Sequence, residues 1–188
     1  MSKKKIKKEK NIEKLKVEKF TINFIGGSAN SEDKEAKELY EQSRFGESKE
    51  GKILYSLVEV LYLLEKERVD VLEEKKKLDV KEFTKKAIKH EPNLLVRYVV
   101  FKDMRNRGYI VKTALKFGAD FRVYDRGVKP GEDHAKWILY PVKETEVLTW
   151  YEFSAKNRVA HSTRKRLLVA VVDEENDCTF YEIKWTRP

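Results

Sequence analysis

The sequence is poor in the residues that build disulfides and metal sites, with one cysteine, Cys178, and three histidines among 188 residues. A single thiol excludes an internal disulfide and a thiolate metal cluster, so a reducing compartment is expected. No apolar run approaches the roughly 18 residues of a membrane span, and no signal-peptide pattern opens the chain. We therefore expect a soluble cytoplasmic protein with no membrane partner and no metal or other cofactor.

Charged side chains are abundant instead. They make up 39% of the chain, with a formal net charge of +9 and a pI near 9.4. Part of the positive charge lies in a basic arm at residues 1–12. Much of the rest lies in residues 93–188, which hold 18 lysines and arginines against 13 acidic residues. A positive half of this kind favours a polyanionic partner, most commonly nucleic acid, although any single charge run also fits a solvated face.

The first half predicts a small mixed α/β domain over residues 13–92. Apolar residues from Leu15 to Ile25 predict short strands that are closed by Gly26-Gly27. Helical spacing predicts helices from Ser31 to before Gly46 and over about 52–67. Asp79 and Glu82 form a capping-box pattern for a third helix, and we place the domain boundary at Pro92.

The second half, residues 93–188, predicts a mixed sheet with helices, so the fold class is α/β (α+β). Helix 94–107 precedes strands at 109–117, 119–124 and 135–142. Thr149 and Glu152 predict a capped helix with Trp150 and Phe153 on its buried face. Strands at 166–172 and 178–185 follow, joined by an acidic turn at 173–177, and Cys178 is expected to be a small core residue.

Three side chains of this half are of the types that a protein can use to cleave RNA without a metal. Tyr124 ends a predicted strand, His134 lies ten residues later in a loop rich in turn residues, and Lys165 lies in the basic cluster Arg158 to Arg166. A base, an acid and a stabilising cation suffice for attack by a 2'-hydroxyl on its phosphate. Each residue alone has an ordinary structural interpretation. We assign structural roles to His161 and His90.

In combination these segments closely resemble the catalytic domain of archaeal tRNA-splicing endonucleases. The matching motifs are Val-Tyr-Asp-Arg-Gly, Pro-Gly-Glu-Asp-His-Ala, Arg-Val-Ala-His-Ser-Thr-Arg-Lys and Ala-Val-Val-Asp, in that order. The resemblance extends from about residue 35 to residue 188. It implies metal-independent cleavage of pre-tRNA at both splice sites within a bulge-helix-bulge element. The implied products carry 2',3'-cyclic phosphate and 5'-hydroxyl ends.

The resemblance also implies roles for particular residues. Tyr124 would be the general base, His134 the general acid and Lys165 the charge stabiliser, although His134 as the base remains open because a phenol is a weak base at neutral pH. Arg158 would clamp a base of the bulge in an RNA bound to a partner subunit, although a plain phosphate contact is the alternative. Weaker candidates for phosphate binding are Arg126, Lys129 and Arg164.

Short-chain members of this family form homotetramers, in which an acidic loop docks into another subunit. The residues that fit this loop are Asp173, Glu174, Glu175 and Asp177, although an ordinary solvated turn is the alternative. The last strand, with Tyr181 and Trp185, is an apolar edge that invites pairing with its twin.

Two other functions remain open. Asp177 followed by Glu182-Ile183-Lys184 weakly matches the acidic-x-Lys pattern of metal-dependent nucleases, a pattern that a highly charged chain often contains by chance. A non-catalytic RNA-binding subunit is the third possibility. Sensitivity to EDTA would distinguish a metal-dependent nuclease from metal-free cleavage. Unaided activity of the purified chain would exclude a non-catalytic subunit.

Overall fold

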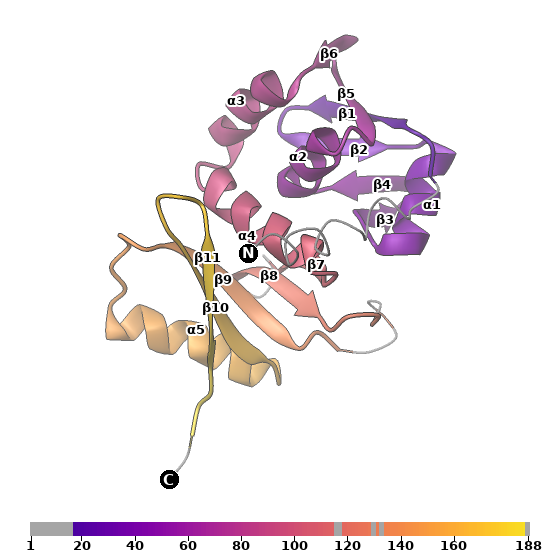
Figure 1. Cartoon of the computed structure of the whole chain (residues 1–188). Helices are drawn as coiled ribbons and strands as arrows, with labels where there is room; N and C mark the ends of the chain where they lie inside the picture. Colours follow the sequence, from indigo (N-terminus) through magenta and orange to yellow (C-terminus); the bar gives the residue numbers. More distant parts are fainter. Residues whose placement is uncertain (1–16, 115–117, 129–130, 132–133, 187–188) are drawn as a thin grey trace, which may run out of the picture. The chain divides into compact units, whose positions relative to one another are not determined.

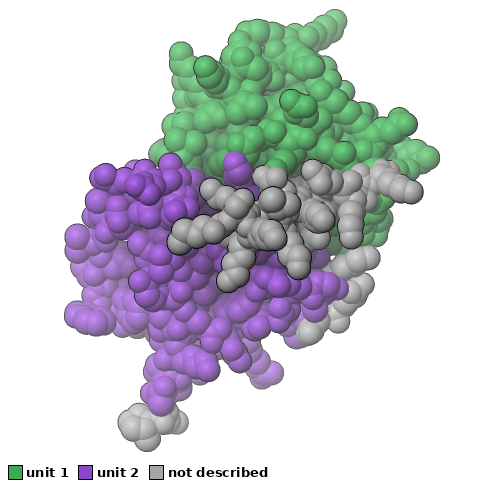
Figure 2. All heavy atoms as spheres, in the orientation of Figure 1, with its two compact units in different colours: residues 1–98 green, residues 99–188 purple. Residues whose placement is uncertain are grey.

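The computed structural model describes residues 17–114, 118–128, 131 and 134–186. It divides into two compact units, residues 1–98 and 99–188, which Figure 2 colours separately. Both units combine helices with a sheet, which confirms the expected mixed α/β class. The basic arm at residues 1–12 lies outside the described residues. None of the described helices is long and apolar enough to cross a membrane.

The first unit holds a six-stranded sheet in the order β3-β4-β2-β1-β5-β6. Its strands are β1 (Phe20–Ile25), β2 (Ser28–Ser31), β3 (Glu47–Lys49), β4 (Lys52–Tyr55), β5 (Val69–Glu73) and β6 (Lys76–Leu78). Its helices are α1 (Lys34–Ser43), α2 (Leu57–Glu65) and α3 (Val80–His90). Strands β1 and β5 are parallel and the other pairs are antiparallel.

Helix α2 forms the centre of this unit, because every residue from Leu57 to Leu64 is buried. Glu59 is among them, and its carboxylate accepts hydrogen bonds from the backbone of Gly46 at 2.9 Å and of Ser56 at 3.0 Å. A buried carboxylate is costly unless donors surround it. Here the bonds cap the helix and fix the chain that precedes β3.

Several boundaries predicted for the first unit are wrong. Residues 28–31 and 52–55 form strands β2 and β4, so α1 begins at Lys34 and α2 at Leu57, later than expected. Strands β3, β5 and β6 were also not predicted from the sequence. Strand β3 consists of three exposed residues and carries no apolar alternation, so only its pairing with β4 makes it a strand.

The second unit holds a five-stranded sheet in the order β11-β10-β9-β8-β7. Its strands are β7 (Ile110–Ala114), β8 (Ala119–Tyr124), β9 (Trp137–Lys143), β10 (Arg166–Val172) and β11 (Cys178–Ile183). Helix α5 (Trp150–Ser162) connects β9 to β10, which are parallel, and the other strand pairs are antiparallel. Helix α4 (Leu94–Asn106) spans the boundary between the units.

Helices pack on both faces of this sheet. Ala160 of α5 joins a buried cluster with Ile138 and Leu167, and Figure 1 shows α5 lying along β9 and β10. On the other face Phe101 of α4 lies 6.0 Å from Phe121, measured between ring centroids. Central residues of the sheet are therefore covered by α5 on one face and by α4 on the other.

The capping box of α5 is confirmed, but its predicted buried face is wrong. Glu152 N donates to Thr149 Oγ1 at 3.2 Å, and Thr149 N donates to the Glu152 carboxylate at 2.8 Å. Trp150, however, is 83% exposed, and Ala160 near the other end is the buried residue. The helix packs on the sheet through its C-terminal half, so its first turn projects into solvent despite its aromatic residues.

Candidate active site

The end of β8 and the beginnings of β9 and β10 meet at one end of the sheet. Strand β8 is antiparallel to β9, and β9 is parallel to β10. Two backbone hydrogen bonds continue the ladder there: Lys136 N donates to Val123 O at 2.8 Å, and Arg166 N donates to Lys136 O at 3.0 Å. Tyr124, the last residue of β8, and Lys165, the residue before β10, are thus brought to the same end.

Tyr124 also belongs to the same face as Arg122, whose charge acts on Lys165. Arg122 lies opposite Ile138, and Ile138 lies opposite Leu167, so these three form one row across the sheet. Ile138 and Leu167 pack in the cluster that contains Ala160 of α5, which identifies the face. Side chains alternate along a strand, so Tyr124, two residues from Arg122, falls on this face, and Lys165, just before β10, is close enough to Arg122 to be affected by its charge.

Lys165 has an altered pKa that agrees with this placement. Burial is the main cause that lowers it, and the positive charge of Arg122 adds to the effect. The ammonium group donates a hydrogen bond to Thr163 O at 2.8 Å. The charge that acts on Lys165 therefore comes from a distant strand and not from its neighbours in the sequence. Arg164 is exposed at a left-handed φ of 55°, and Arg166 binds Glu182.

Tyr124 and His134 lie in contrasting environments. Tyr124 is 5% exposed, and His134 is exposed in the segment just before β9. With at most about 3.6 Å per residue, the three steps from Trp137 keep His134 within about 11 Å of the start of β9. Its neighbours Glu132 and Asp133 lie outside the described residues. The structure therefore brings all three candidate residues to one end of the sheet.

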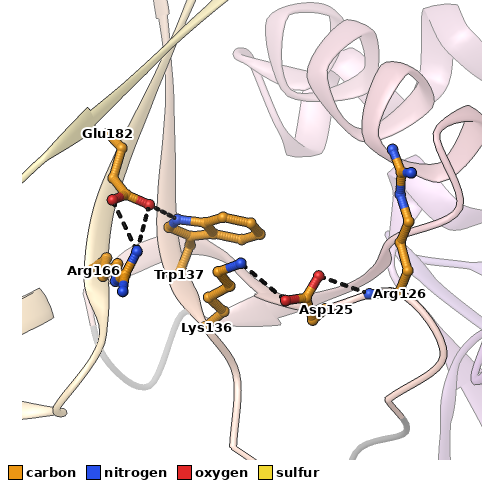
Figure 3. Close-up of polar contacts among 6 residues, drawn as sticks. All are labelled: Asp125, Arg126, Lys136, Trp137, Arg166 and Glu182. Carbon is orange, nitrogen blue, oxygen red and sulfur yellow. Dashed lines mark hydrogen bonds and ion pairs between the residues drawn. The ribbon is translucent and has the colours of Figure 1, made fainter.

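A second group of residues surrounds these strand ends, and most of them were not predicted from the sequence to belong to the site (Figure 3). Lys136 Nζ lies 2.9 Å from Asp125 Oδ2 and 4.4 Å from the ring centroid of Trp137. Trp137 Nε1 donates to Glu182 at 2.7 Å, and Arg166 lies 3.1 Å from the same carboxylate. The hydrogen bond from Lys136 is the main cause that lowers the pKa of Asp125. Asp125 directly follows Tyr124 and Lys136 directly precedes β9, and these positions were the available signal in the sequence.

The candidate RNA-binding residues are dispersed around the second unit. Arg158 is exposed on α5, with its guanidinium 6.0 Å from the ring centroid of Tyr151. Arg126 is exposed and lies 4.9 Å from the ring centroid of Tyr109. Lys129 lies outside the described residues. A planar cation stacked on an aromatic ring is an arrangement that can accept an unstacked base.

Arg158 also lines a groove of about 590 Å³ along α5. His161 and Trp185 lie in the same groove, with ring centroids 4.8 Å apart. We expected a hydrogen-bonded structural role for His161, but it is exposed and packs edge-on against an aromatic ring. The groove thus presents a cation, an imidazole and an indole to solvent.

The acidic turn is a hairpin connection, as the sequence predicted. Asp177 N donates to Asp173 Oδ1 at 2.8 Å, and Glu174 N donates to Glu144 at 3.1 Å. These bonds hold the backbone while the carboxylates of Glu174 and Glu175 face solvent. Strand β11, drawn in yellow in Figure 1, is an edge of the sheet. Two aromatic side chains near it, Tyr181 and Trp185, are each 55% exposed.

Glu182, which belongs to the pattern that suggested a metal-dependent nuclease, has other partners in the structure. Glu182 already accepts hydrogen bonds from Trp137 and Arg166. Cys178 is half-buried, and its pKa is raised to about 12, mainly by burial, so its thiol stays protonated. Within the part of the chain that the structure describes, no group of three or more His, Cys, Asp or Glu residues is placed to hold a metal ion.

Known proteins match both units. The N-terminal domain of tRNA intron endonuclease matches residues 22–84, and its catalytic C-terminal domain matches residues 94–180. A tRNA-splicing endonuclease of Nanoarchaeum equitans is 48% identical over 138 residues, covering 70% of this chain and 88% of that protein. One from Thermococcus onnurineus is 40% identical over 171 residues, covering 90% and 98%. The chain belongs to the tRNA intron endonuclease family.

Proposed function

We propose that this chain cleaves pre-tRNA at both splice sites of a bulge-helix-bulge element, without a metal ion. The products would carry 2',3'-cyclic phosphate and 5'-hydroxyl ends. One observation carries the proposal beyond family membership: Tyr124 and Lys165 lie at one end of the sheet, where His134 precedes β9. These are the three types of group that cleavage by an internal 2'-hydroxyl requires.

The proposed reaction is an in-line displacement at phosphorus. The 2'-oxygen forms a bond to the adjacent phosphorus, and the bond from phosphorus to the 5'-oxygen breaks. Tyr124 takes the proton of the 2'-hydroxyl, and His134 gives a proton to the departing 5'-oxygen. Lys165 stabilises the negative charge on the phosphoryl oxygens, which a desolvated ammonium does more strongly than a hydrated one.

The division of acid and base between Tyr124 and His134 has an alternative. A phenol has a reference pKa of about 10, so it ionises near neutral pH only with help from nearby cations. Lys165 and Arg122, which lie close enough for the charge of Arg122 to act on Lys165, would be the cations that supply such help. If that help is insufficient, His134 serves as the base and Tyr124 as the acid, with the same products.

RNA recognition is proposed to use cations that lie outside the reacting groups. Arg158 stacks on a base of the bulge, and Arg126, Lys129 and Arg164 bind phosphates.

Two cuts at a fixed separation require two sites held rigidly apart. Since each chain carries one candidate site, at least two copies are required, and we propose the homotetramer that the resemblance to short-chain members of the family implies. The exposed edge strand β11 and the acidic turn are the proposed contacts.

The first prediction concerns the reaction itself. The purified chain is expected to cleave a bulge-helix-bulge transcript at both sites in excess EDTA, because its reacting groups need no metal. End analysis should find cyclic phosphate and 5'-hydroxyl. Activity that EDTA abolishes, or 3'-hydroxyl and 5'-phosphate ends, would support the metal-dependent alternative. An RNA that the chain binds and leaves uncut would support a non-catalytic subunit.

The second prediction concerns assembly. The acidic residues of the turn are replaced by their amides, Asp173→Asn, Glu174→Gln, Glu175→Gln and Asp177→Asn. If the turn docks into a basic surface of another subunit, light scattering should change from a tetramer to dimers held by β11. Cleavage should fall with it. In a monomer the change would be nearly neutral, because isolated surface charges contribute little.

A charge-matched control separates docking from a general effect of net charge. It replaces four exposed glutamates elsewhere by glutamine: Glu50, Glu67, Glu74 and Glu146. This variant should remain tetrameric. A wild-type monomer, or a tetramer that survives neutralisation of the turn, would show that the assembly proposal is wrong.

A further inference from the structure

The segment that carries His134 is closed at its neck by an ion pair. The chain leaves β8 at Tyr124 and re-enters the sheet at Trp137, so Asp125 is the first residue out and Lys136 the last residue back. Asp125 Oδ2 lies 2.9 Å from Lys136 Nζ, and Lys136 N donates to Val123 O at 2.8 Å. A side-chain bond and a backbone bond therefore join the two ends of the segment.

Asp125 and Lys136 each make a further contact besides their ion pair. Asp125 Oδ1 accepts a hydrogen bond from Arg126 N at 3.0 Å, and Figure 3 shows the guanidinium of Arg126 pointing away from this carboxylate. Lys136 Nζ lies over the ring of Trp137, whose indole N–H is bonded to Glu182 of β11. The pair thus connects the neck to the strands beside it and is more constrained than an isolated surface contact.

We propose that Asp125 and Lys136 are positioning residues, whose ion pair fixes His134 relative to Tyr124. His134 lies two residues before Lys136, and Tyr124 directly precedes Asp125, so the pair joins the immediate neighbours of two reacting groups. The inference rests on the proposed function of those two residues. It assigns neither Asp125 nor Lys136 a contact with the reacting atoms.

The pair is expected to affect the rate of cleavage far more than the stability of the fold. The Lys136 and Asp125 side chains are 37% and 48% exposed, and exposed ion pairs contribute little to stability. Catalysis depends more steeply on position, since a displacement of about 1 Å can slow a reaction by about 10²-fold. Loosening the neck should therefore slow the chemical step and leave the melting temperature close to that of the wild type.

The effects of Asp125→Asn on RNA binding and on the cleavage rate distinguish a positioning role of the ion pair from a purely electrostatic one. Asp125→Asn removes a negative charge beside the proposed RNA site, so RNA binding should be unchanged or tighter. If the ion pair positions His134, the single-turnover rate at saturating protein should nevertheless fall by about tenfold. A purely electrostatic role would improve binding without slowing cleavage.

The decisive experiment is a double-mutant cycle on the full-length protein with a bulge-helix-bulge transcript. It compares Asp125→Asn, Lys136→Met and the double variant, with RNA affinity and melting temperature measured for each. If the residues act as a pair, the double variant should cleave no more slowly than the slower single variant. The control is Glu32→Gln, which breaks the exposed Lys52–Glu32 ion pair of the first unit and should change nothing.

The outcomes separate the inference from the function on which it rests. If the rate losses of the two single variants multiplied in the double variant, the inference alone would be overturned. The same would follow if Asp125→Asn cleaved at the wild-type rate while His134→Ala was slow. A wild-type rate for His134→Ala would overturn the proposed function and the inference with it. A shared loss of rate, with RNA affinity retained in Asp125→Asn, supports the pair as a positioning device.

Discussion

Replacing His134 by alanine is expected to slow single-turnover cleavage by roughly 10²-fold or more, the usual scale for the loss of a general acid or base. The imidazole is exposed just before β9, so its removal leaves no cavity and the fold should be unaffected. Affinity for the RNA should stay near that of the wild type, because phosphate contacts supply most of the binding. Rates at saturating protein and a separate binding titration would measure the two effects.

His161 provides the matched control. It is also exposed and also lies in the second unit, but its ring packs against Trp185 in the α5 groove. His161→Ala should leave the chemical step intact and change mainly the local packing. If both alanine variants lost the same rate while remaining folded, His134 would have no special role and our choice of histidine would be wrong.

Lys165→Ala should reduce the rate by about 10²–10³-fold, similar to the loss of one group that stabilises an oxyanion. The predicted effect is large because the ammonium group is partly desolvated, and charges interact more strongly where water is excluded. Lys165→Arg preserves a positive charge and should retain part of the activity, with the remaining loss due to the larger guanidinium.

The lowered pKa of Lys165 also predicts a pH dependence. As the pH rises through that pKa, which lies below the usual lysine range, the ammonium group loses its charge and cleavage by the wild type should slow. Arginine stays charged at every accessible pH, so Lys165→Arg should lack this alkaline decline. Single-turnover rates against pH, corrected for the background hydrolysis of the RNA, would measure it. An alkaline decline that is identical in both proteins would exclude Lys165 as its origin.

The amino-acid sequence alone determined the features that depend on neighbouring residues. The capping boxes at Asp79 and Thr149 marked the starts of α3 and α5 correctly, because a cap is a bond between residues three apart. The acidic turn was correctly identified as the connection of a hairpin. Ordered motifs around Tyr124, His134 and Lys165 were enough to identify the family, which the comparisons confirm. The catalytic roles of these residues remain predictions.

Only the tertiary structure decided which distant residues meet. No local pattern marks β3 as a strand, because its polar residues gain their bonds from β4. Trp150 projects into solvent because α5 packs through its other end. Arg122 acts on Lys165, and Lys136 pairs with Asp125, because strand pairing places them together. The last two effects follow from sheet register, which brings together residues on different strands and is strongly specified only where one face of the sheet is buried.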